Sequence, residues 1–272
     1  MSASATSAAA LPRTWQRPPF IASPFTRWAL YAGAALYLVL AIASLEVDWD
    51  RVRQGLDRGW AFVQGFLNPN FTSRWDDIVI GFQESLTMTV TSTALGVLLS
   101  IPVAVGAARN LAPTWIYLIC RGFVAISRTL NEIIVAILLV AMFGFGPFAG
   151  FLTLTFATIG FIAKLMAEDI EEIEASQLEA LRATGAGYLQ VLDFAVLSQV
   201  MPRLVGLSLY RLDINFRESA VIGIVGAGGI GATLNTAMDR YEFDSAAAII
   251  LVIIAIVMMA EYGSGWLRKR IQ

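Results

Sequence analysis

The sequence predicts an all-α membrane protein with about six transmembrane helices. Hydrophobic residues make up 57% of its 272 residues, whereas charged residues make up only 15%. Soluble globular chains carry nearer a quarter charged residues. Several apolar stretches also reach the length of about 18 residues that a membrane-spanning helix needs. We therefore expect the chain to fold within a lipid bilayer.

Five of the six expected spans are long apolar stretches, whereas the fifth carries several charges and would be missed by hydropathy alone. We place them at 28–45, 85–108, 114–143, 148–167, 203–226 and 245–267. The glycine-rich break Gly144-Phe-Gly-Pro147 separates the third span from the fourth. Residues 83–272 would then form a core transmembrane domain, with a cytoplasmic loop at about 168–202.

The ends of the chain are expected in the cytoplasm. Residues 1–27 are rich in Ala, Ser, Pro and Arg, which is typical of a disordered tail, and 28–82 would hold the first span and an external segment. Basic residues flank the outermost spans at Arg13, Arg17, Arg27, Arg268, Lys269 and Arg270. Because basic residues favour the cytoplasmic side and six spans return the chain to its starting side, both termini are predicted there.

The composition disfavours several kinds of site. The chain has no histidine and one cysteine, Cys120, within an apolar stretch. Histidine-based triads, zinc sites and disulfides need residues that this sequence lacks. The net charge of −2 does not favour nucleic acid. We expect no catalytic residue, metal, cofactor or nucleic-acid partner, and membrane lipid as the surroundings.

A short polar segment between the fourth and fifth spans predicts a helix outside the bilayer. Ser176 and Glu179 have the spacing of a capping box, and Gly185 stands where a helix would end. A helix of about two turns is unstable alone and must pack against something. It is suited either to dock on another protein or to lie as an ordinary amphipathic helix at the interface. The acidic residues that follow Lys164 are expected to form a solvated helix end.

Charged residues inside the expected spans are costly and need partners or an aqueous path. Pairs four residues apart, Arg128 with Glu132 and Asp213 with Arg217, can form ion pairs on one helix face. Such pairs could hold helices together, or they could line a path in which arginine binds an anion. The path candidates are Arg128, Glu132, Arg211, Asp213, Asn215 and Arg217.

A glycine-rich stretch at 224–231 contains the dinucleotide-binding pattern G-x-G-x-x-G. Its context disfavours a cofactor, because a membrane span precedes it and another follows, leaving no room for a βαβ unit. Glycines at the end of a span instead permit an irregular turn or close backbone approach. We interpret Gly226, Gly228, Gly229 and Gly231 as candidates for a gate or hinge.

From residue 128 to the end, the sequence resembles the permeases of bacterial phosphonate ABC importers. The segments that carry the resemblance are 128–132 (RTLNE), 144–150 (GFGPFAG), 179–187 (EALRATGAG), 210–217 (YRLDINFR) and 223–231 (GIVGAGGIG). Residues 179–187 resemble the EAA loop, through which such permeases bind their ATPase. The family pattern has proline at the positions of Asn131 and Ser198, so we expect a lost kink at the first and a looser coupling segment at the second.

The resemblance implies a type I ABC importer permease-like fold in the bacterial inner membrane. It implies a homodimer, two copies of an ABC ATPase subunit and an external phosphonate-binding protein. It also implies ATPase-coupling roles for Glu179, Ala180, Arg182, Gly185, Ala186 and Gly187. The chain lacks a G-x-x-x-x-G-K-[ST] loop, so we expect a permease rather than an enzyme, with ATP hydrolysed by the separate subunit.

Other functions stay open at this point. The substrate could be phosphonate, phosphite or phosphate, and a methionine-type or other ABC permease is an alternative. A stand-alone channel or ion-coupled carrier is a rival from another class, as is a membrane-embedded enzyme. The role of residues 46–82 is also open, although Trp49, Trp60 and Trp75 suit a membrane interface.

Overall fold

A computed structural model describes residues 21, 23–45 and 48–271 of the chain. Most of these residues are helical, and none of the described residues forms a β-strand. The predicted tail at 1–27 falls mostly on residues outside the described ranges, so it stays a prediction. The chain divides into two units, residues 1–58 and 59–272.

The first unit contains the helix α1 (Pro24–Ala43) and the start of α2 (Trp49–Leu67). Pro24 begins α1, where its missing N–H costs nothing. No residue of α1 is buried, as expected for a helix that faces lipid. Its length and hydropathy make it a candidate membrane span, close to the predicted first span.

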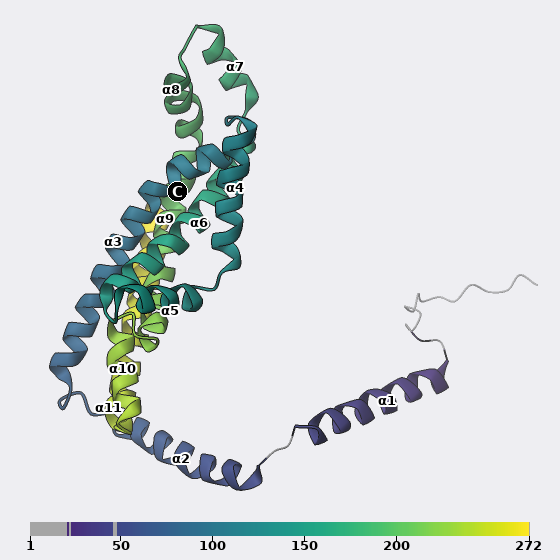
Figure 1. The fold of residues 1–272 in the computed structure, drawn as a ribbon, viewed down its shortest axis with the longest axis vertical. Helices are drawn as coiled ribbons and strands as arrows, with labels where there is room; N and C mark the ends of the chain where they lie inside the picture. The colour runs from purple at the N-terminus through teal and green to yellow at the C-terminus, as the bar shows by residue number, and fades with distance from the viewer. Residues whose placement is uncertain (1–20, 22, 46–47, 272) are drawn as a thin grey trace, which may run out of the picture. The chain divides into compact units, whose positions relative to one another are not determined.

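The second unit is a bundle built around three long helices, α3 (Trp75–Ala107), α6 (Pro147–Glu171) and α9 (Ser198–Ile224) (Figure 1). The remaining helices of this unit are α4 (Thr114–Thr129), α5 (Glu132–Phe143), α7 (Ala175–Ala183), α8 (Tyr188–Val191), the π-helix η1 (Leu192–Leu197), α10 (Ile230–Asp239) and α11 (Phe243–Ile271). In Figure 1, α7 and α8 lie at one end of the unit and α10 lies at the other. We call these the α7 end and the α10 end.

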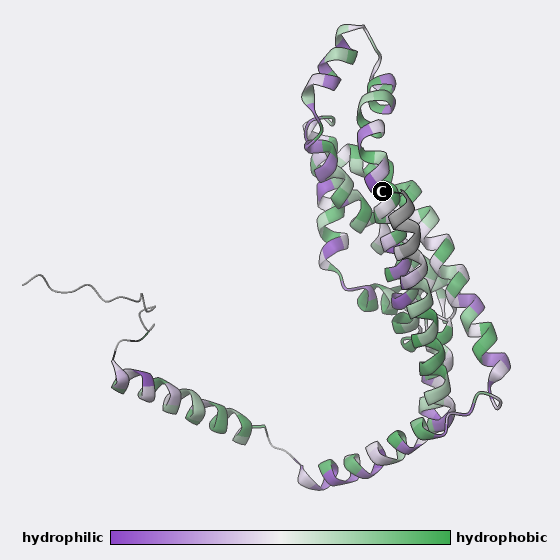
Figure 2. Cartoon of the chain, turned by 180° about the vertical axis from the view of Figure 1, so that it is seen from behind, coloured by the Kyte–Doolittle hydropathy of each residue, from purple (hydrophilic) through white to green (hydrophobic). Residues whose placement is uncertain are grey.

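The number of candidate membrane-spanning helices agrees with the predicted number of about six. Five described helices are long and apolar enough to cross a bilayer, and a sixth span results if the bent pair α4 and α5 counts as one. α3 begins ten residues before the predicted span, at Trp75, because the polar turns that contain Asp76 and Asp77 are also helical. Hydrophobic residues occur along most helices of the second unit (Figure 2), and many of their large side chains are exposed.

Small residues allow the helices of the bundle to approach closely. A Cβ added at Gly96 of α3 would lie 2.6 Å from Thr158 of α6. A Cβ at Gly160 of α6 would lie 2.1 Å from the hydroxyl oxygen of Ser127 on α4. Helices in membranes gain little from the hydrophobic effect between them, so close van der Waals packing of this kind stabilises the bundle.

The predicted third span is broken. α4 and α5 meet at an angle of 97°, with Leu130 and Asn131 in extended conformations between them. The side-chain oxygen of Asn131 accepts the backbone N–H of Ile133 at 2.8 Å and so caps α5. The expectation that Asn131 removes a kink is therefore wrong, because an N-cap stabilises the break as a proline would. The pairing expected between Arg128 and Glu132 is also wrong, because the break puts them on separate helices.

The coupling segment continues directly into the fifth span. α8, η1 and α9 form one continuous helical run, Tyr188–Ile224, which contains Pro202. The hydroxyl of Ser198 donates to the carbonyl oxygen of Phe194 at 2.6 Å, and the helix passes through Ser198 without interruption. The helix is therefore unbroken at Ser198, and the looser end of the coupling segment stays a prediction. The local irregularity is the π-helical turn η1, which ends directly before Ser198.

A polar cluster joins the helices at the α10 end. The guanidinium of Arg74, which precedes α3, forms ion pairs with Asp77 and with Glu242, which precedes α11. Its Nη2 lies 3.1 Å from Oε1 of Glu242. This hydrogen bond holds the pKa of the Glu242 carboxyl below its usual range. The cluster therefore links the starts of α3 and α11.

The close contact of α4 with α6 gives a first prediction. Replacing Gly160 with valine would force Ser127 away, and overpacking of this kind costs about 1–3 kcal/mol of stability. Thermal unfolding in detergent, followed by a thiol-reactive dye at Cys120, should show a lower midpoint for Gly160→Val. Gly122→Val on α4 is the control, since no atom lies within 4 Å of a Cβ at that position. Equal midpoints for the two variants would contradict the assigned contact.

The Arg74–Glu242 pair gives a second prediction, in which stability depends on pH. Because folding lowers the pKa of Glu242, its contribution is present above the ordinary value of 4.5 and is lost as the pH falls through the folded-state pKa. The wild type should therefore unfold at a higher temperature than Glu242→Gln at pH 7. The difference should shrink towards pH 3. A difference that stays constant across this range would show that the ion pair does not stabilise the fold.

Candidate functional site

The short polar helix predicted from the sequence is α7, and it begins earlier than the pattern indicates. Glu174 is the N-cap residue, in extended conformation, and α7 starts at Ala175. Ser176 therefore lies inside the first turn, where its side chain cannot cap the helix. The predicted capping box of Ser176 with Glu179 is wrong. The start of α7 is instead held from α9, because Oε1 of Gln199 accepts the Glu174 N–H at 3.3 Å.

The predicted end of this helix is confirmed. Gly185 has a φ of +81°, a conformation that glycine adopts without strain. The N–H of Gly185 donates to Arg182 and the N–H of Ala186 donates to Leu181, at 3.0 and 3.4 Å. These two bonds form a Schellman motif, which satisfies carbonyl groups at the helix end.

One side of α7 packs on the bundle and the other is exposed. Leu178 is 7% exposed and belongs to a core cluster against which Leu181 and Ala186 also pack. Ala186 is therefore half-buried rather than part of the outer surface. The other coupling candidates are all exposed: Glu179, Ala180, Arg182, Gly185 and Gly187. A short helix is thus held rigidly from beneath and presents a small polar surface.

The acidic residues at the end of α6 do not form a freely solvated helix end. Asp169 pairs with Arg203 of α9 at 3.0 Å. Glu171 pairs with Arg121 of α4 at 2.9 Å and accepts the backbone N–H of Arg109 at 2.8 Å. These contacts connect α6 with α4, α9 and the segment after α3. Sequence analysis did not predict the contacts of Arg109 and Arg203, because nothing local to either residue indicates its partner.

Two of the path candidates on α9, Arg211 and Asn215, lie inside the bundle. Arg211 is 2% exposed, and its Nε donates to the hydroxyl of Thr158 at 3.3 Å. Its Nη2 lies 3.7 Å from Oε1 of Glu132 on α5, and its guanidinium stacks over Phe161. Arg128 also lies over the Phe161 ring, with its guanidinium carbon 5.4 Å from the ring centroid. The pair that forms is thus Arg211 with Glu132.

Asn215 is completely buried and joins three helices. Its side-chain nitrogen donates to the hydroxyl oxygens of Thr93 on α3 and Thr158 on α6, both at 2.8 Å. Interhelical hydrogen bonds of this kind orient helices within a membrane. The structure therefore gives Asn215 a role in holding α3, α6 and α9 together.

The other two path candidates on α9 lie on a different face. Asp213 pairs with Arg217 at 3.0 Å, which confirms the pairing predicted from their spacing. The Arg217 side chain is 57% exposed, whereas that of Asp213 is 10% exposed. Arg217 is thus directed outward, whereas Asp213 holds it from a mostly covered position.

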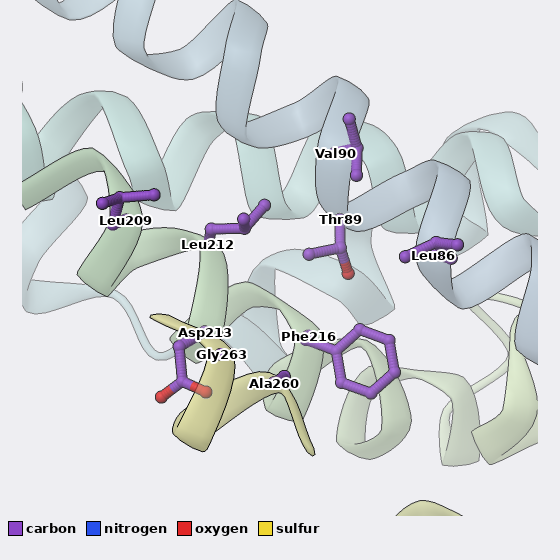
Figure 3. Close-up of a pocket in the computed structure, with 9 residues that line it drawn as sticks. All are labelled: Leu86, Thr89, Val90, Leu209, Leu212, Asp213, Phe216, Ala260 and Gly263. Carbon is purple, nitrogen blue, oxygen red and sulfur yellow. The ribbon is translucent and has the colours of Figure 1, made fainter. Parts of the chain in front are cut away.

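Asp213 lines an apolar cavity of about 200 Å³ between α3, α9 and α11 (Figure 3). Two oxygens there, Oδ1 of Asp213 and the hydroxyl of Thr89, are buried and have no hydrogen-bond partner among the described residues. The other lining residues are Leu86, Val90, Leu209, Leu212, Phe216, Ala260 and Gly263. The cavity is therefore apolar with two polar atoms.

The glycine-rich loop between α9 and α10 has a backbone conformation that favours glycine at several positions. Gly226, Gly228 and Gly229 all have positive φ values, between 74° and 93°. A Cβ at Gly231 would lie 1.9 Å from the carbonyl oxygen of Ala220, so α10 approaches α9 closely there. The loop follows a helix rather than a strand, unlike a dinucleotide-binding turn.

A second glycine turn and α3 hold this loop. The N–H of Gly146 donates to the carbonyl of Gly226 at 3.0 Å. Glu84 of α3 accepts the Gly229 N–H at 2.9 Å, and the hydroxyl of Ser85 accepts the Ile230 N–H at 3.0 Å. Glu84 and Ser85 thus cap the start of α10 from a distant part of the sequence. Sequence analysis missed both residues.

Comparison with known proteins adds to this geometry. Residues 96–272 match the family described as "Binding-protein-dependent transport system inner membrane component". The phosphate-import permease protein PhnE of Mycolicibacterium smegmatis is 43% identical over 204 residues, which are 75% of this chain but only 38% of that protein. The putative phosphite transport system permease protein HtxC of Stutzerimonas stutzeri is 35% identical over 232 residues, 85% of this chain and 82% of that protein.

Solved structures support the same fold. An inward-facing MetNI methionine ABC transporter matches with a TM-score of 0.60 and 24% identity, over 72% of this chain and 96% of that chain. An amino acid ABC transporter also matches with a TM-score of 0.60, at 15% identity, over 74% of this chain and 98% of that chain. The chain therefore has the type I ABC importer permease fold.

The buried amide gives a third prediction. Replacing Asn215 with leucine removes two interhelical hydrogen bonds, each worth about 0.6 kcal/mol in a membrane, and should lower stability by about 1–2 kcal/mol. A double-mutant cycle of Asn215→Leu with Thr93→Val separates the bond from repacking. We expect a coupling free energy of about 0.5–1.5 kcal/mol in detergent unfolding. Additive effects of the two substitutions would contradict the contact.

Proposed function

Because the chain belongs to the family of binding-protein-dependent transport system inner membrane components, we propose that it is the permease subunit of an ATP-binding-cassette importer for a phosphorus oxyanion. Phosphonate, phosphite and phosphate share a tetrahedral anionic head. The names of the M. smegmatis and S. stutzeri relatives, at 43% and 35% identity, support this substrate class. A methionine-type permease has weaker support, since the MetNI likeness at 24% identity concerns the fold alone.

The observation that carries this proposal is the construction of α7. Leu178 and Leu181 fix the helix to the bundle, while Glu179, Ala180 and Arg182 remain exposed at one end of the unit. Such a surface suits the groove of a separate ATPase subunit. We assign the ATPase-coupling role to the exposed face of α7 and to the turn at Gly185 and Gly187, with Ala186 packed beneath. ATP hydrolysis belongs to the separate subunit, of which two copies would bind a dimeric permease.

Movement of α7 would be passed to the long helices through polar contacts. The Glu174 N–H is bonded to Gln199 of α9, and Asp169 of α6 is paired with Arg203 of α9. A displacement imposed on α7 by closure of an ATPase pair would therefore move α6 and α9 together. Alternating access would then follow from rearrangement of these packed helices against a second subunit.

The outward charges of α9 support a dimer. Arg217 is 57% exposed in a single copy, at a position within an apolar helix bundle. A charge in contact with acyl chains costs about 2.5–3.5 kcal/mol on insertion scales, so this face requires cover or water. We propose that Arg217, held by the mostly covered Asp213, faces the second copy and the substrate path. Arg128, Glu132, Arg211 and Asn215 then support that path from inside each subunit.

The glycine turns at the α10 end are proposed as the gate at the other mouth of the path. Gly226, Gly228 and Gly229 adopt backbone conformations that other residues rarely adopt, and Gly231 packs directly on α9. A cavity of about 520 Å³ lies beside this loop and is lined by Glu84 and Phe145 among others. With α7 in the cytoplasm, this loop lies on the external side, where a binding protein would deliver substrate. Both termini are then cytoplasmic, in the bacterial inner membrane.

Reconstitution with the cognate ATPase and binding protein provides the test and the fourth prediction. The binding protein loaded with phosphonate, phosphite or phosphate should stimulate ATP hydrolysis, and Glu179→Lys or Gly185→Val should reduce that stimulation at least about tenfold, or about 1.4 kcal/mol. Glu172→Lys is the matched control, since this exposed glutamate precedes α7.

Three outcomes would count against the proposal. Equal loss in the control and in Glu179→Lys would remove the coupling assignment. Stimulation by methionine and by no phosphorus oxyanion would overturn the substrate class. An ATPase that does not bind this chain at all would favour the stand-alone channel or carrier instead.

A further inference from the structure

The helix α2 carries an apolar stripe that no described part of the chain covers. The stripe residues recur every three or four positions, and they are Trp49, Val52, Leu56, Trp60, Val63 and Leu67. Each is at least 41% exposed. Residues at this spacing share one face of an α-helix. A stripe of this kind, with two tryptophans, requires an apolar contact that the described residues do not provide.

Outside the stripe, the first half of α2 is strongly polar. Arg51 and Arg58 lie on the side of the helix opposite the stripe, while Arg53, Asp50 and Asp57 flank it. Apolar and polar residues alternate along the ribbon of α2 in Figure 2. These five charges lie within nine consecutive residues, 50–58. They exclude α2 from crossing a bilayer, because each charge would cost about 2.5–3.5 kcal/mol at the centre of the bilayer.

The stripe is not the face by which α2 packs on the protein. Phe62 stacks edge to face with Phe243 at the start of α11, with ring centroids 5.7 Å apart. A Cβ at Gly65 would lie 2.9 Å from the backbone of Phe243. Phe62, Gly65 and Phe66 are half-buried and lie on the face of α2 that points away from the stripe, with Gly65 directly opposite it. The end of α2 is therefore fixed beside the first turn of a membrane span, and the stripe is left free.

Short connections also keep α2 near the membrane. Five residues, 44–48, separate it from α1, and seven residues, 68–74, separate it from α3. Both neighbours are candidate membrane spans. An extended residue reaches at most about 3.6 Å, so α2 must begin within about 20 Å of the end of α1. Asn70 and Ser73 in the second connection are bonded to Asp244 and Ser245 of α11.

We propose that α2 is an interfacial anchor that lies flat on the bilayer surface, at the side where α1 ends and α3 begins. Its stripe is buried at the boundary between phospholipid headgroups and acyl chains. Trp49 and Trp60 occupy the depth at which amphipathic rings are enriched, and Arg53 reaches lipid phosphates from the edge of the stripe. The partner is phospholipid, since the ends of α2 are tied to membrane spans and its charges complement headgroups. The inference is independent of what the protein transports.

Site-directed spin labelling provides the test and the fifth prediction. Single cysteines replace Leu56 in the stripe and Gln54 on the polar side, in a full chain with Cys120→Ser. The protein is reconstituted in vesicles of phosphatidylethanolamine and phosphatidylglycerol. The label at position 56 should be several-fold more accessible to oxygen than to a water-soluble nickel chelate. The label at position 54 should show the reverse.

Two results would overturn the proposal. Equal access of the nickel chelate to both positions would place α2 in water. A label at position 56 shielded from oxygen and from the chelate alike would mean that protein, such as a second copy or a binding protein, covers the stripe.

A second measurement needs no cysteine variant. Lipids brominated near the headgroup end of the acyl chain should quench the fluorescence that Trp60 contributes, obtained as the difference between wild type and Trp60→Phe. The same difference for Trp115, on α4 and 65% exposed, serves as the reference for a residue on another lipid-exposed helix. Absence of quenching for Trp60 alone would exclude the interfacial position.

Discussion

The amide of Asn215, bonded to Thr93 and Thr158, is the contact on which the second unit depends. A bilayer interior provides no water, so a buried amide must find its partners on neighbouring helices. Only one rotation and one height of α3, α6 and α9 bring these three side chains together. Arg211 lies one turn earlier on α9 and donates to the same Thr158. One threonine hydroxyl thus receives two donors and fixes the register of α3, α6 and α9.

Glycine on α3 allows the helices to approach closely enough for these hydrogen bonds to form. Gly96 of α3 lies directly against Thr158, where a Cβ would be 2.6 Å from the threonine side chain. A larger residue there would push α3 from α6 and separate Thr93 from Asn215. Close packing and polar bonding therefore act at the same place. This combination stabilises a membrane bundle in which burial of apolar surface adds little, since lipid is as apolar as leucine.

The sequence predicts those features that depend on local patterns. Apolar length predicts all the spans except the charged fifth, four-residue spacing predicts the pair of Asp213 with Arg217, and Gly185 correctly marks the end of α7. Features that depend on distant residues were not predictable in this way. Glu84 caps α10 from 145 residues away, so no local pattern indicates it. The break before Glu132 had a local signal, since asparagine caps helices well, but we interpreted its apolar surroundings as one continuous span.

The arrangement of α9 limits how its two ends can communicate. Between Ser198 and Ile224 this helix is fixed by Arg203, Arg211, Asn215 and the contact of Gly223 with α10, so it must move largely as a rigid body. Deformation has to occur where the hydrogen-bond ladder is weakest. The π-helical turn η1 lies next to α7, and the positive-φ glycines lie next to α10. A rigid-body displacement of α9 would therefore be taken up at its two ends, in the π-helical turn η1 and in the glycine loop.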